Sequence, residues 1–300
     1  MRKIFLFVMS ISLLVMSCND DDNSGPNTRQ LTLNISGLTN LGPAAQYEGW
    51  VIVNGAPVST GTFTVNDGGQ LSSTSFDVQA SDLDNATNFV LTIEPIPDND
   101  EAPSAVHILG GDFSANSADL TISHATALGT GFTGVSGGYI LATPTTTDDT
   151  DELSGVWFLD NSSGSPAPGL VNLPDLTELT GWNYEGWAVI DGTPVSTGTF
   201  NKAAGMDDNA TTSSFKGTDG DGPGYPGEDF INNAPAGLTF PTNLQGGAIV
   251  VSIEPVPDND PAPFVLKPLS GDVPTDAQAL TFYQLNNIAA STYPTGTATR

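Results

Sequence analysis

Basic residues and histidine are scarce in this 300-residue chain, which has 7 Lys and Arg and 2 His against 34 Asp and Glu. The formal net charge is −27. Such an acidic surface repels the phosphates of nucleic acid and the headgroups of anionic lipid. The composition therefore excludes nucleic acid as a partner and favours solubility, salt tolerance or cation binding.

Cysteine is almost absent as well. The single Cys18 cannot form a disulfide within the chain, and an exported protein with one free thiol would be unusual. It follows an uncharged run from Ile4 to Met16, which is too short to span a bilayer and fits a secretory signal peptide. The letters LVMSC ending at Cys18 resemble the lipobox of bacterial lipoproteins. We predict a signal peptide over residues 1–17 and a lipid on Cys18; the alternative is an ordinary signal peptide with an incidental cysteine.

The segment after the cysteine is polar and acidic, and we interpret residues 18–28 as a tether that cannot pack. Acidic residues at this place resemble the signal that sends some Gram-negative lipoproteins to the outside of the outer membrane. We therefore predict an outer-membrane protein, held through the lipid on Cys18 and lying on the cell surface or on the periplasmic face.

The chain repeats two blocks of its own sequence. Residues 47–63 and 184–200 are identical at 12 of 17 positions, and LTIEPIPDNDEAP at 91–103 returns as VSIEPVPDNDPAP at 251–263. Self-similarity of this kind indicates an internal duplication. The second copy carries extra residues between its two blocks, within 201–246.

Short runs rich in Val, Ile, Thr and aromatic residues, separated by Gly and Pro, predict β-strands, and no stretch has a sustained helical period. Asn54-Gly55 and Asp191-Gly192 stand between such runs and predict hairpin turns. The fold class that we expect is all-β, with two tandem β-sandwich (Ig-like) domains. The strands expected late in the second copy include Phe264–Leu266 and Leu280–Tyr283. The expected units are a domain at 29–145, a linker at 146–153, and a domain at 154–300 with an insertion at 201–246.

Each copy has the order aromatic-Glu-Gly-Trp, an apolar strand, Asn/Asp-Gly, Pro-Val-Ser-Thr-Gly-Thr-Phe, and then Ile-Glu-Pro before an acidic, proline-rich turn. This order resembles the extracytoplasmic C-terminal domain of anti-sigma-K factors, and the resemblance implies a β-sandwich. Working anti-sigma factors also have a cytoplasmic sigma-binding domain and a transmembrane helix. We expect neither here, so the resemblance does not imply that this chain sequesters a sigma factor. The matching residues are Trp50, Pro57, Val58, Gly61, Phe63, Glu94, Pro95 and Pro103, and in the second copy Trp187, Pro194, Val195, Gly198, Phe200, Glu254, Pro255 and Pro263.

Acidic loops are the candidate cation sites. The loop from Asp98 to Asp100 and its counterpart from Asp258 to Asp260 carry the hard oxygen atoms that calcium prefers. The alternative is a pair of Asx turns, in which Asp and Asn bond their own backbone. A stretch of the insertion also begins like a calcium loop, although its later residues do not fit an EF-hand. Calcium is the only candidate cofactor, and its candidate ligands are Glu94, Asp98, Asp100, Glu254, Asp258, Asp260, Asp219 and Asp221.

Signals for catalysis are weak. His107 and His124 lack a neighbouring Cys or second His, and no nucleophile elbow, phosphate loop or dinucleotide motif occurs. We expect Trp50 and Trp187 in the core, the alternative being an exposed platform for a sugar. We predict no catalytic residues and a non-enzymatic role in binding or scaffolding an envelope protein, an extracellular protein or a glycan. Two alternatives stay open: an anti-sigma-related signalling component outside the cytoplasm, and a carbohydrate-binding or carbohydrate-active surface protein.

Overall fold

The structure is a computed structural model that describes residues 27–258 and 260–300. The predicted signal peptide and Cys18 lie outside these residues. Strands make up nearly all the regular structure within them, so the predicted all-β class is confirmed. None of the described helices is both long enough and apolar enough to cross a membrane. The helices are the 3-10 turn η1 (Gly42–Ala44) and the short helices α1 (Ala80–Asn85) and α2 (Ala289–Thr292).

Eight strands form the first sheet: β1 (Thr28–Ser36), β2 (Ala45–Val53), β3 (Ala56–Phe63), β4 (Ser75–Gln79), β5 (Ala86–Pro95), β6 (His107–Ser114), β7 (Ser117–Leu120) and β19 (Thr295–Thr299). Their order is β3-β2-β5-β6-β7-β19-β1-β4. The sheet curls until its end strands come close, so that the rings of Phe63 and Phe76 have centroids 6.0 Å apart. Buried residues alternate with exposed ones along β1, as expected for a strand with one face on the core.

The second sheet contains β8 (Ser136–Leu141), β9 (Gly155–Trp157), β13 (Trp182–Ile190), β14 (Thr193–Phe200), β15 (Gly227–Asp229), β16 (Ala248–Pro255), β17 (Leu269–Asp272) and β18 (Tyr283–Asn287), with β12 (Leu170–Val171) paired to β8. The order is β14-β13-β16-β17-β18-β8-β9-β15. A small separate ladder joins β10 (Leu159–Asp160) and β11 (Ala167–Pro168).

The repeated sequence blocks form matching hairpins. The β2–β3 turn has φ of 52° at Asn54 and 82° at Gly55, and the β13–β14 turn has 50° at Asp191 and 81° at Gly192. Positive φ at both central residues is the signature of the type I′ turn that joins tightly twisted strands. The predicted hairpins are therefore confirmed, and each central strand then pairs with β5 or β16 on its other side.

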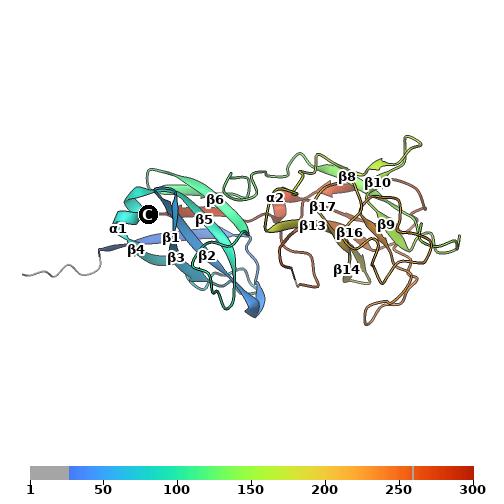
Figure 1. Ribbon diagram of the computed structural model, residues 1–300, viewed down its shortest axis with the longest axis horizontal. Coiled ribbons are helices and arrows are strands. Elements are labelled where there is room, and N and C mark those ends of the chain that lie inside the picture. The colour runs from blue at the N-terminus through green and yellow to red at the C-terminus, as the bar shows by residue number, and fades with distance from the viewer. Residues whose placement is uncertain (1–26, 259) are drawn as a thin grey trace, which may run out of the picture.

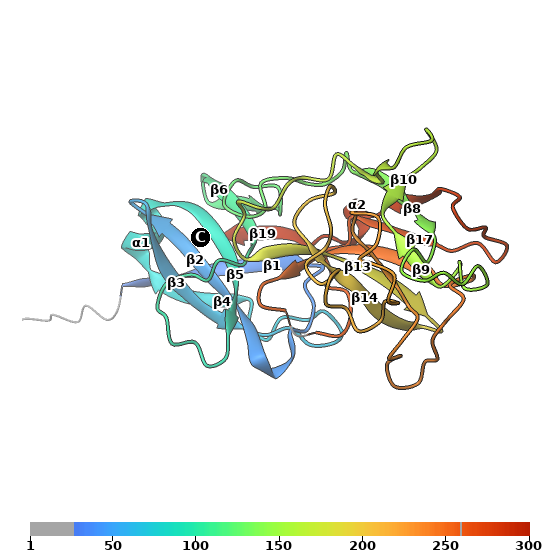
Figure 2. The same ribbon diagram turned by 45° about the vertical axis from the view of Figure 1, so that its right-hand side comes forward.

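The sheets do not divide the chain at the expected linker. Strand β8 precedes residues 146–153 in the sequence but belongs to the second sheet, whereas β19 near the other end belongs to the first. Figure 1 shows the C end of the chain beside α1, among the strands of the first half, and Figure 2 shows β19 next to β1.

Two strands expected late in the second copy were wrong. Phe264–Leu266 is a loop that covers the end of β16, where the Phe264 N–H donates to the Glu254 carboxylate at 2.8 Å. Leu280 has a φ of 59° and is 58% exposed, so the strand does not begin there. The strands of this region are β17, which begins at Leu269, and β18, which begins at Tyr283, the last residue of the second expected run.

The insertion at 201–246 supplies the last strand of the second sheet. Its strand β15 pairs with β9 at one edge. Three of its aromatic rings, those of Phe215, Phe230 and Phe240, pack together with centroids 5.5 to 6.2 Å apart. These ring contacts give a stretch rich in Gly and Pro a small apolar cluster of its own.

Candidate functional site

A tryptophan and two glutamates lie in one hydrogen-bonded cluster in the first half. Trp50 donates its indole N–H to the Thr92 hydroxyl at 2.9 Å, and that hydroxyl donates to the Glu94 carboxylate. Glu48, beside Trp50 on β2, accepts a hydrogen bond from the Ser59 hydroxyl. Trp50 is 3% exposed, so the prediction that it is a core residue is confirmed and the sugar platform is wrong for it.

The second half contains the same cluster. Trp187 donates to the Ser252 hydroxyl at 2.8 Å, Ser252 donates to Glu254, and Glu185 accepts from Ser196. Trp187 is also buried, as predicted. In both halves the tryptophan follows a register shift in its hairpin and stands opposite the serine that bonds the neighbouring glutamate. The two carboxylates of each cluster are therefore held by strand pairing and by hydroxyl donors.

The two clusters differ at their backbone donor. The Ser104 N–H lies 2.9 and 3.2 Å from the two Glu94 oxygens, whereas the Phe264 N–H reaches only Oε1 of Glu254. The Oε2 atom of Glu254 is buried without a hydrogen-bond partner among residues 27–258 and 260–300. A buried carboxylate oxygen without a donor makes the charged form costly.

Burial accordingly favours the protonated acids in the second cluster. It raises the pKa of Glu254 to about 8 and the pKa of Glu185 to about 7, while the serine hydroxyls act in the opposite direction. Burial also raises the pKa of Glu48 in the first cluster. Lys267 lies near Glu254; burial lowers its pKa, and the Glu254 charge opposes that change.

The acidic loops after the clusters form Asx turns. Asp98 accepts the Asp100 N–H and Asp258 accepts the Asp260 N–H, at 3.0 and 2.9 Å. Asp100 in turn accepts the Ala102 N–H, and Asp260 accepts the Ala262 N–H, both at 3.0 Å. Within the described part of the chain, no group of three or more His, Cys, Asp and Glu is arranged to hold a metal. Calcium binding by these loops stays a prediction.

The calcium-like stretch of the insertion engages its acids differently. The Lys216 ammonium pairs with the Asp221 carboxylate and also donates to the Gly220 carbonyl at 2.8 Å. Asp219 is exposed, and its N–H donates to the Thr145 carbonyl at 2.9 Å. Asp221 is thus engaged by a lysine and Asp219 by a backbone carbonyl, and neither contact involves another candidate calcium ligand.

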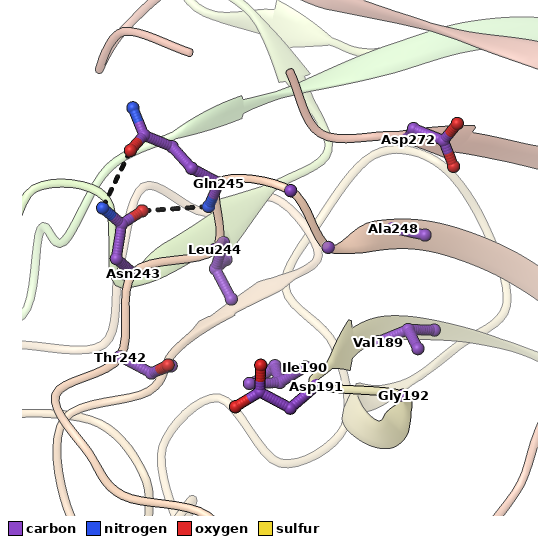
Figure 3. A pocket seen from close by; sticks show the side chains of 12 residues that line it. Val189, Ile190, Asp191, Gly192, Thr242, Asn243, Leu244, Gln245, Ala248 and Asp272 are labelled. Carbon is purple, nitrogen blue, oxygen red and sulfur yellow. Dashed lines mark hydrogen bonds between the residues drawn. The ribbon is translucent and has the colours of Figure 1, made fainter. Parts of the chain in front are cut away.

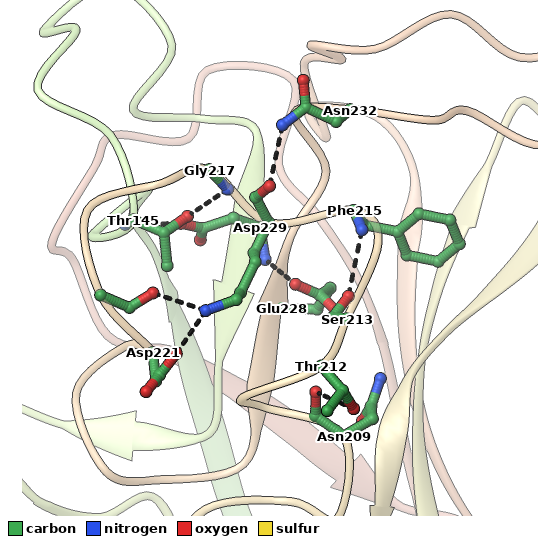
Figure 4. Close-up of polar contacts among 12 residues, drawn as sticks. Thr145, Asn209, Thr212, Ser213, Phe215, Gly217, Asp221, Glu228, Asp229 and Asn232 are labelled. Carbon is green, nitrogen blue, oxygen red and sulfur yellow. Dashed lines mark hydrogen bonds and ion pairs between the residues drawn. The ribbon is translucent and has the colours of Figure 1, made fainter.

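Sequence reasoning missed a buried acid in the insertion. Asp229 on β15 is fully buried, and one carboxylate oxygen accepts the Thr145 N–H at 2.8 Å and the Thr145 hydroxyl at 2.6 Å (Figure 4). Its other oxygen accepts the Trp157 indole at 2.9 Å. Burial raises the pKa of Asp229 to about 6. The acid ties the insertion to β9 and to the segment after β8.

Two more acids surround it. Glu228 accepts the Ser213 hydroxyl and the Asp229 N–H, and Asp207 accepts the Gly227 N–H at 3.1 Å. Burial raises the pKa of Glu228 to about 7 and that of Asp207 to about 6. The signal in the sequence is the pair Glu228-Asp229, which stands directly before the apolar residues Phe230 and Ile231.

A cavity of about 280 Å³ lies beyond the β13–β14 turn. Asp191 and Asp272 border it from different elements, and Asn243 and Gln245 border it from the loop before β16 (Figure 3). The two amide side chains are bonded to each other, with Asn243 Nδ2 2.9 Å from Gln245 Oε1. The polar groups on this side of the cavity are thus already paired.

Both histidines contact Thr126 and lie away from the acidic clusters of the second half. Nδ1 of His107 lies 2.7 Å from the Thr126 carbonyl, and Nδ1 of His124 lies 2.8 Å from its hydroxyl. Nε2 of His124 lies 3.2 Å from Asp112. These contacts fix the loop after β7.

Comparison with known families finds one match. The family model described as "Anti-sigma-K factor rskA, C-terminal" matches residues 23–107, which takes in β1 to β5 of the first half. No curated protein and no solved structure matches. The first half is therefore similar to an anti-sigma-factor-related component, and the match includes Trp50, Glu94 and the loop that follows.

Proposed function

We propose that this chain is a lipid-anchored protein of the cell envelope whose two copies of one β-sandwich unit bind or scaffold a partner outside the cytoplasm, without catalysis. The observation that carries the proposal is the repeated cluster with its repeated loop. In each half a hydroxyl links the Trp to the second Glu, a serine bonds the first Glu, and an exposed apolar residue follows, with Ile96 43% exposed and Val256 41% exposed. The duplication of the sequence blocks supports two equivalent binding units.

The chemistry of these loops supports one class of partner. Ile96 and Val256 each precede acidic Asx turns, so each loop combines a small apolar contact with negative charge. A protein with an apolar socket rimmed by Lys or Arg fits this combination. Two such loops on one chain raise the effective concentration of the second contact once the first has formed.

The non-catalytic part of the proposal rests on how the acids are used. Glu94, Asp229 and Oε1 of Glu254 accept hydrogen bonds from their own framework, and the donors Ser104, Thr145 and Phe264 tie these strand residues to loops. Acids held in this way stabilise the architecture that presents the loops.

Anchoring is tested at Cys18 in cells. Labelling with a palmitate analogue and membrane fractionation should both depend on this residue, so Cys18→Ala should lose the label and leave the membrane fraction. Unchanged labelling of Cys18→Ala would reject the lipid anchor.

Partner binding is tested by affinity capture from envelope extracts. The double variant Ile96→Asp/Val256→Asp should lose the captured partner, because it places a charge in the apolar contact. The matched control is Val171→Asp, since Val171 is 49% exposed on β12 and lies outside both loops. A partner retained by the double variant would show that the two loops are not the binding site.

The family match favours one alternative, an anti-sigma-related signalling component that acts outside the cytoplasm. Purified chain should not bind a sigma factor directly if the proposal is right. Specific recovery of a sigma factor by the purified chain would contradict the proposal, and recruitment of the chain by a transmembrane protein would favour the alternative.

A further inference from the structure

The strand that follows each half is paired in the sheet of the other half. β8 comes directly after β7 in the sequence, yet it pairs with β18 and β9. β19 comes directly after β18, yet it pairs with β1 and β7. Figure 2 shows β19 in the first half and β8 in the second.

The exchanged strands occupy equivalent slots. In the first sheet β19 stands between β7 and β1, and in the second sheet β8 stands between β18 and β9. If each half kept its own last strand, β8 would occupy the place of β19 and β19 the place of β8. The two halves of the chain have therefore exchanged their last strands, β8 and β19.

The first slot holds β19 by contacts along its whole length. Ala298 is fully buried, and the slot is tight at Gly296, where a Cβ would stand 2.4 Å from the Asn34 carbonyl oxygen. Arg300 follows the strand, donates to the carbonyl oxygens of Leu83, Ala86 and Ala115, and stacks 4.3 Å above the Phe113 ring.

The two connections that cross between the halves meet at one point. Nδ2 of Asn287 donates to the carbonyl oxygens of Phe132 and Val135, at 2.9 and 2.8 Å. The Phe132 and Tyr293 rings pack edge to face, 6.0 Å apart. The other contacts that hold β19 are its pairing with β1 and β7 and the contacts of Arg300. These contacts do not involve the connecting residues 288–294.

We propose that the slot between β1 and β7 also accepts β19 of a second copy of this chain, which gives a strand-exchanged dimer. β19 is reached through the single connection 288–294, so it can leave without unpairing β8, β17 or β18. The strand ladders and the Arg300 contacts are the same whichever chain supplies the strand, and exchange of an identical element is a low-cost route to dimers. Two chains with net charge −27 repel each other, so dimers should accumulate as salt rises.

The register supplies a direct test. Asn34 of β1 and Thr297 of β19 are opposite partners, whereas Gln30 of β1 faces Asp77 of β4. Asn34 and Gln30 are both exposed on the same face of β1. One batch of chain starting at residue 27 carries Asn34→Cys, and a second carries Thr297→Cys, so that the engineered thiols are the only ones. The batches are mixed at high concentration in 1 M salt (a Debye length of about 3 Å), warmed, cooled and oxidised, and the 34–297 disulfide is quantified by mass spectrometry.

The mixture should form at least about tenfold more of this interchain disulfide than a matched mixture of Gln30→Cys with Thr297→Cys, because strand pairing raises the effective concentration of the two thiols. A chain with both Asn34→Cys and Thr297→Cys, oxidised before mixing, should stay monomeric. Equal yields in the two mixtures would overturn the proposal. Failure of the double variant to form its own disulfide would overturn it as well, since β19 would then not occupy the slot.

Discussion

Ser252 donates a hydrogen bond to Glu254, two residues further along β16, and with the same oxygen it accepts the Trp187 indole at 2.8 Å. Thr92 does the same between Trp50 and Glu94 in the first half. One hydroxyl thus satisfies an indole and a carboxyl that are both buried. Both halves need a residue with a hydroxyl at this position of the strand.

Removal of that hydroxyl should destabilise the protein. Ser252→Ala leaves the Trp187 N–H buried without its partner and removes one of the two donors to Oε1 of Glu254, so we expect the free energy of unfolding to fall by roughly 1–3 kcal/mol. Urea unfolding followed by tryptophan fluorescence measures the change. The control Ser214→Ala, at an exposed serine of the insertion, should change it by less than about 0.5 kcal/mol. Equal effects of the two variants would contradict the role of the shared hydroxyl.

Glu254 should make stability depend on pH. Its pKa rises from about 4.5 to about 8 on folding, so the folded state binds the proton more tightly than the unfolded state does. This contribution is complete below pH 4.5 and is lost as the pH rises through 8. The free energy of unfolding should therefore fall by up to about 1.4 kcal/mol per pH unit for this group within that window.

Glu254→Gln isolates this contribution, because an amide of similar shape cannot ionise. Urea unfolding from pH 4.5 to 8 should give a shallower pH dependence for the variant than for the wild type. Asp276→Asn, at an exposed carboxylate, is the matched control and should leave the wild-type slope in place. Parallel pH curves for wild type and Glu254→Gln would refute the argument.

Asp229 should be the acid on which the insertion depends most. Asp229→Asn turns one acceptor into an amide N–H₂ that faces the Trp157 indole or the Thr145 N–H, both of which are donors. We expect a loss of roughly 2–3 kcal/mol in the free energy of unfolding, within the range for a buried unsatisfied polar group. Asp221→Asn, which breaks the partly exposed pair with Lys216, should cost less than about 1 kcal/mol. Chemical denaturation of the two variants in parallel makes the comparison, and an equal cost would be against the buried role.

Local features of this fold could be predicted from the sequence. The pairs Asn54-Gly55 and Asp191-Gly192 predict the turn type, because both positions of the turn need a positive φ and these residue types adopt it readily. Trp50 and Trp187 could be assigned to the core because alternating strands place large aromatics inward. These inferences depend on neighbours in the sequence and need no knowledge of distant pairing.

Distant pairing is what the sequence could not supply. β8 and β19 have strand-like composition, but nothing in their residues states which sheet receives them. The run Phe264–Leu266 is apolar like a strand. Its Phe264 N–H, however, donates to the Glu254 carboxylate and not to a neighbouring strand, and the run is a loop. The acids at Glu228 and Asp229 become buried only because the insertion returns to β9. Each of these outcomes depends on contacts between segments far apart in the chain.

The fit of β19 should depend on a glycine. A Cβ at Gly296 would lie 2.4 Å from the Asn34 carbonyl and 2.7 Å from the Ile35 Cα, both backbone atoms of β1. Gly296→Ala should therefore push β19 from the sheet and lower the free energy of unfolding by about 1–3 kcal/mol, as overpacking does. Gly134→Ala is the control, since a Cβ there meets no atom within 4 Å. Amide exchange of β1 and β7 should speed up only in Gly296→Ala; unchanged protection would argue against a tight slot.

Charge should make the stability respond to ions. With 34 Asp and Glu against 7 Lys and Arg, repulsion across the surface destabilises the compact state at low salt. The Debye length falls from about 10 Å at 0.1 M to about 3 Å at 1 M, so the melting temperature should rise with sodium chloride. The calcium prediction requires a further rise with millimolar calcium, because an ion bound only by the folded state stabilises it by mass action.

Magnesium at matched ionic strength separates these two effects. It screens charge as calcium does but demands a tighter octahedral shell. The variant Asp98→Asn/Asp258→Asn keeps an oxygen for each Asx turn while it removes two charges from the proposed ligand set. Calcium bound by these loops would raise the melting temperature of the wild type above the magnesium value, and the double variant would lose that excess and keep the sodium chloride response. Equal melting temperatures in the two ions would reject calcium binding and leave screening as the whole effect.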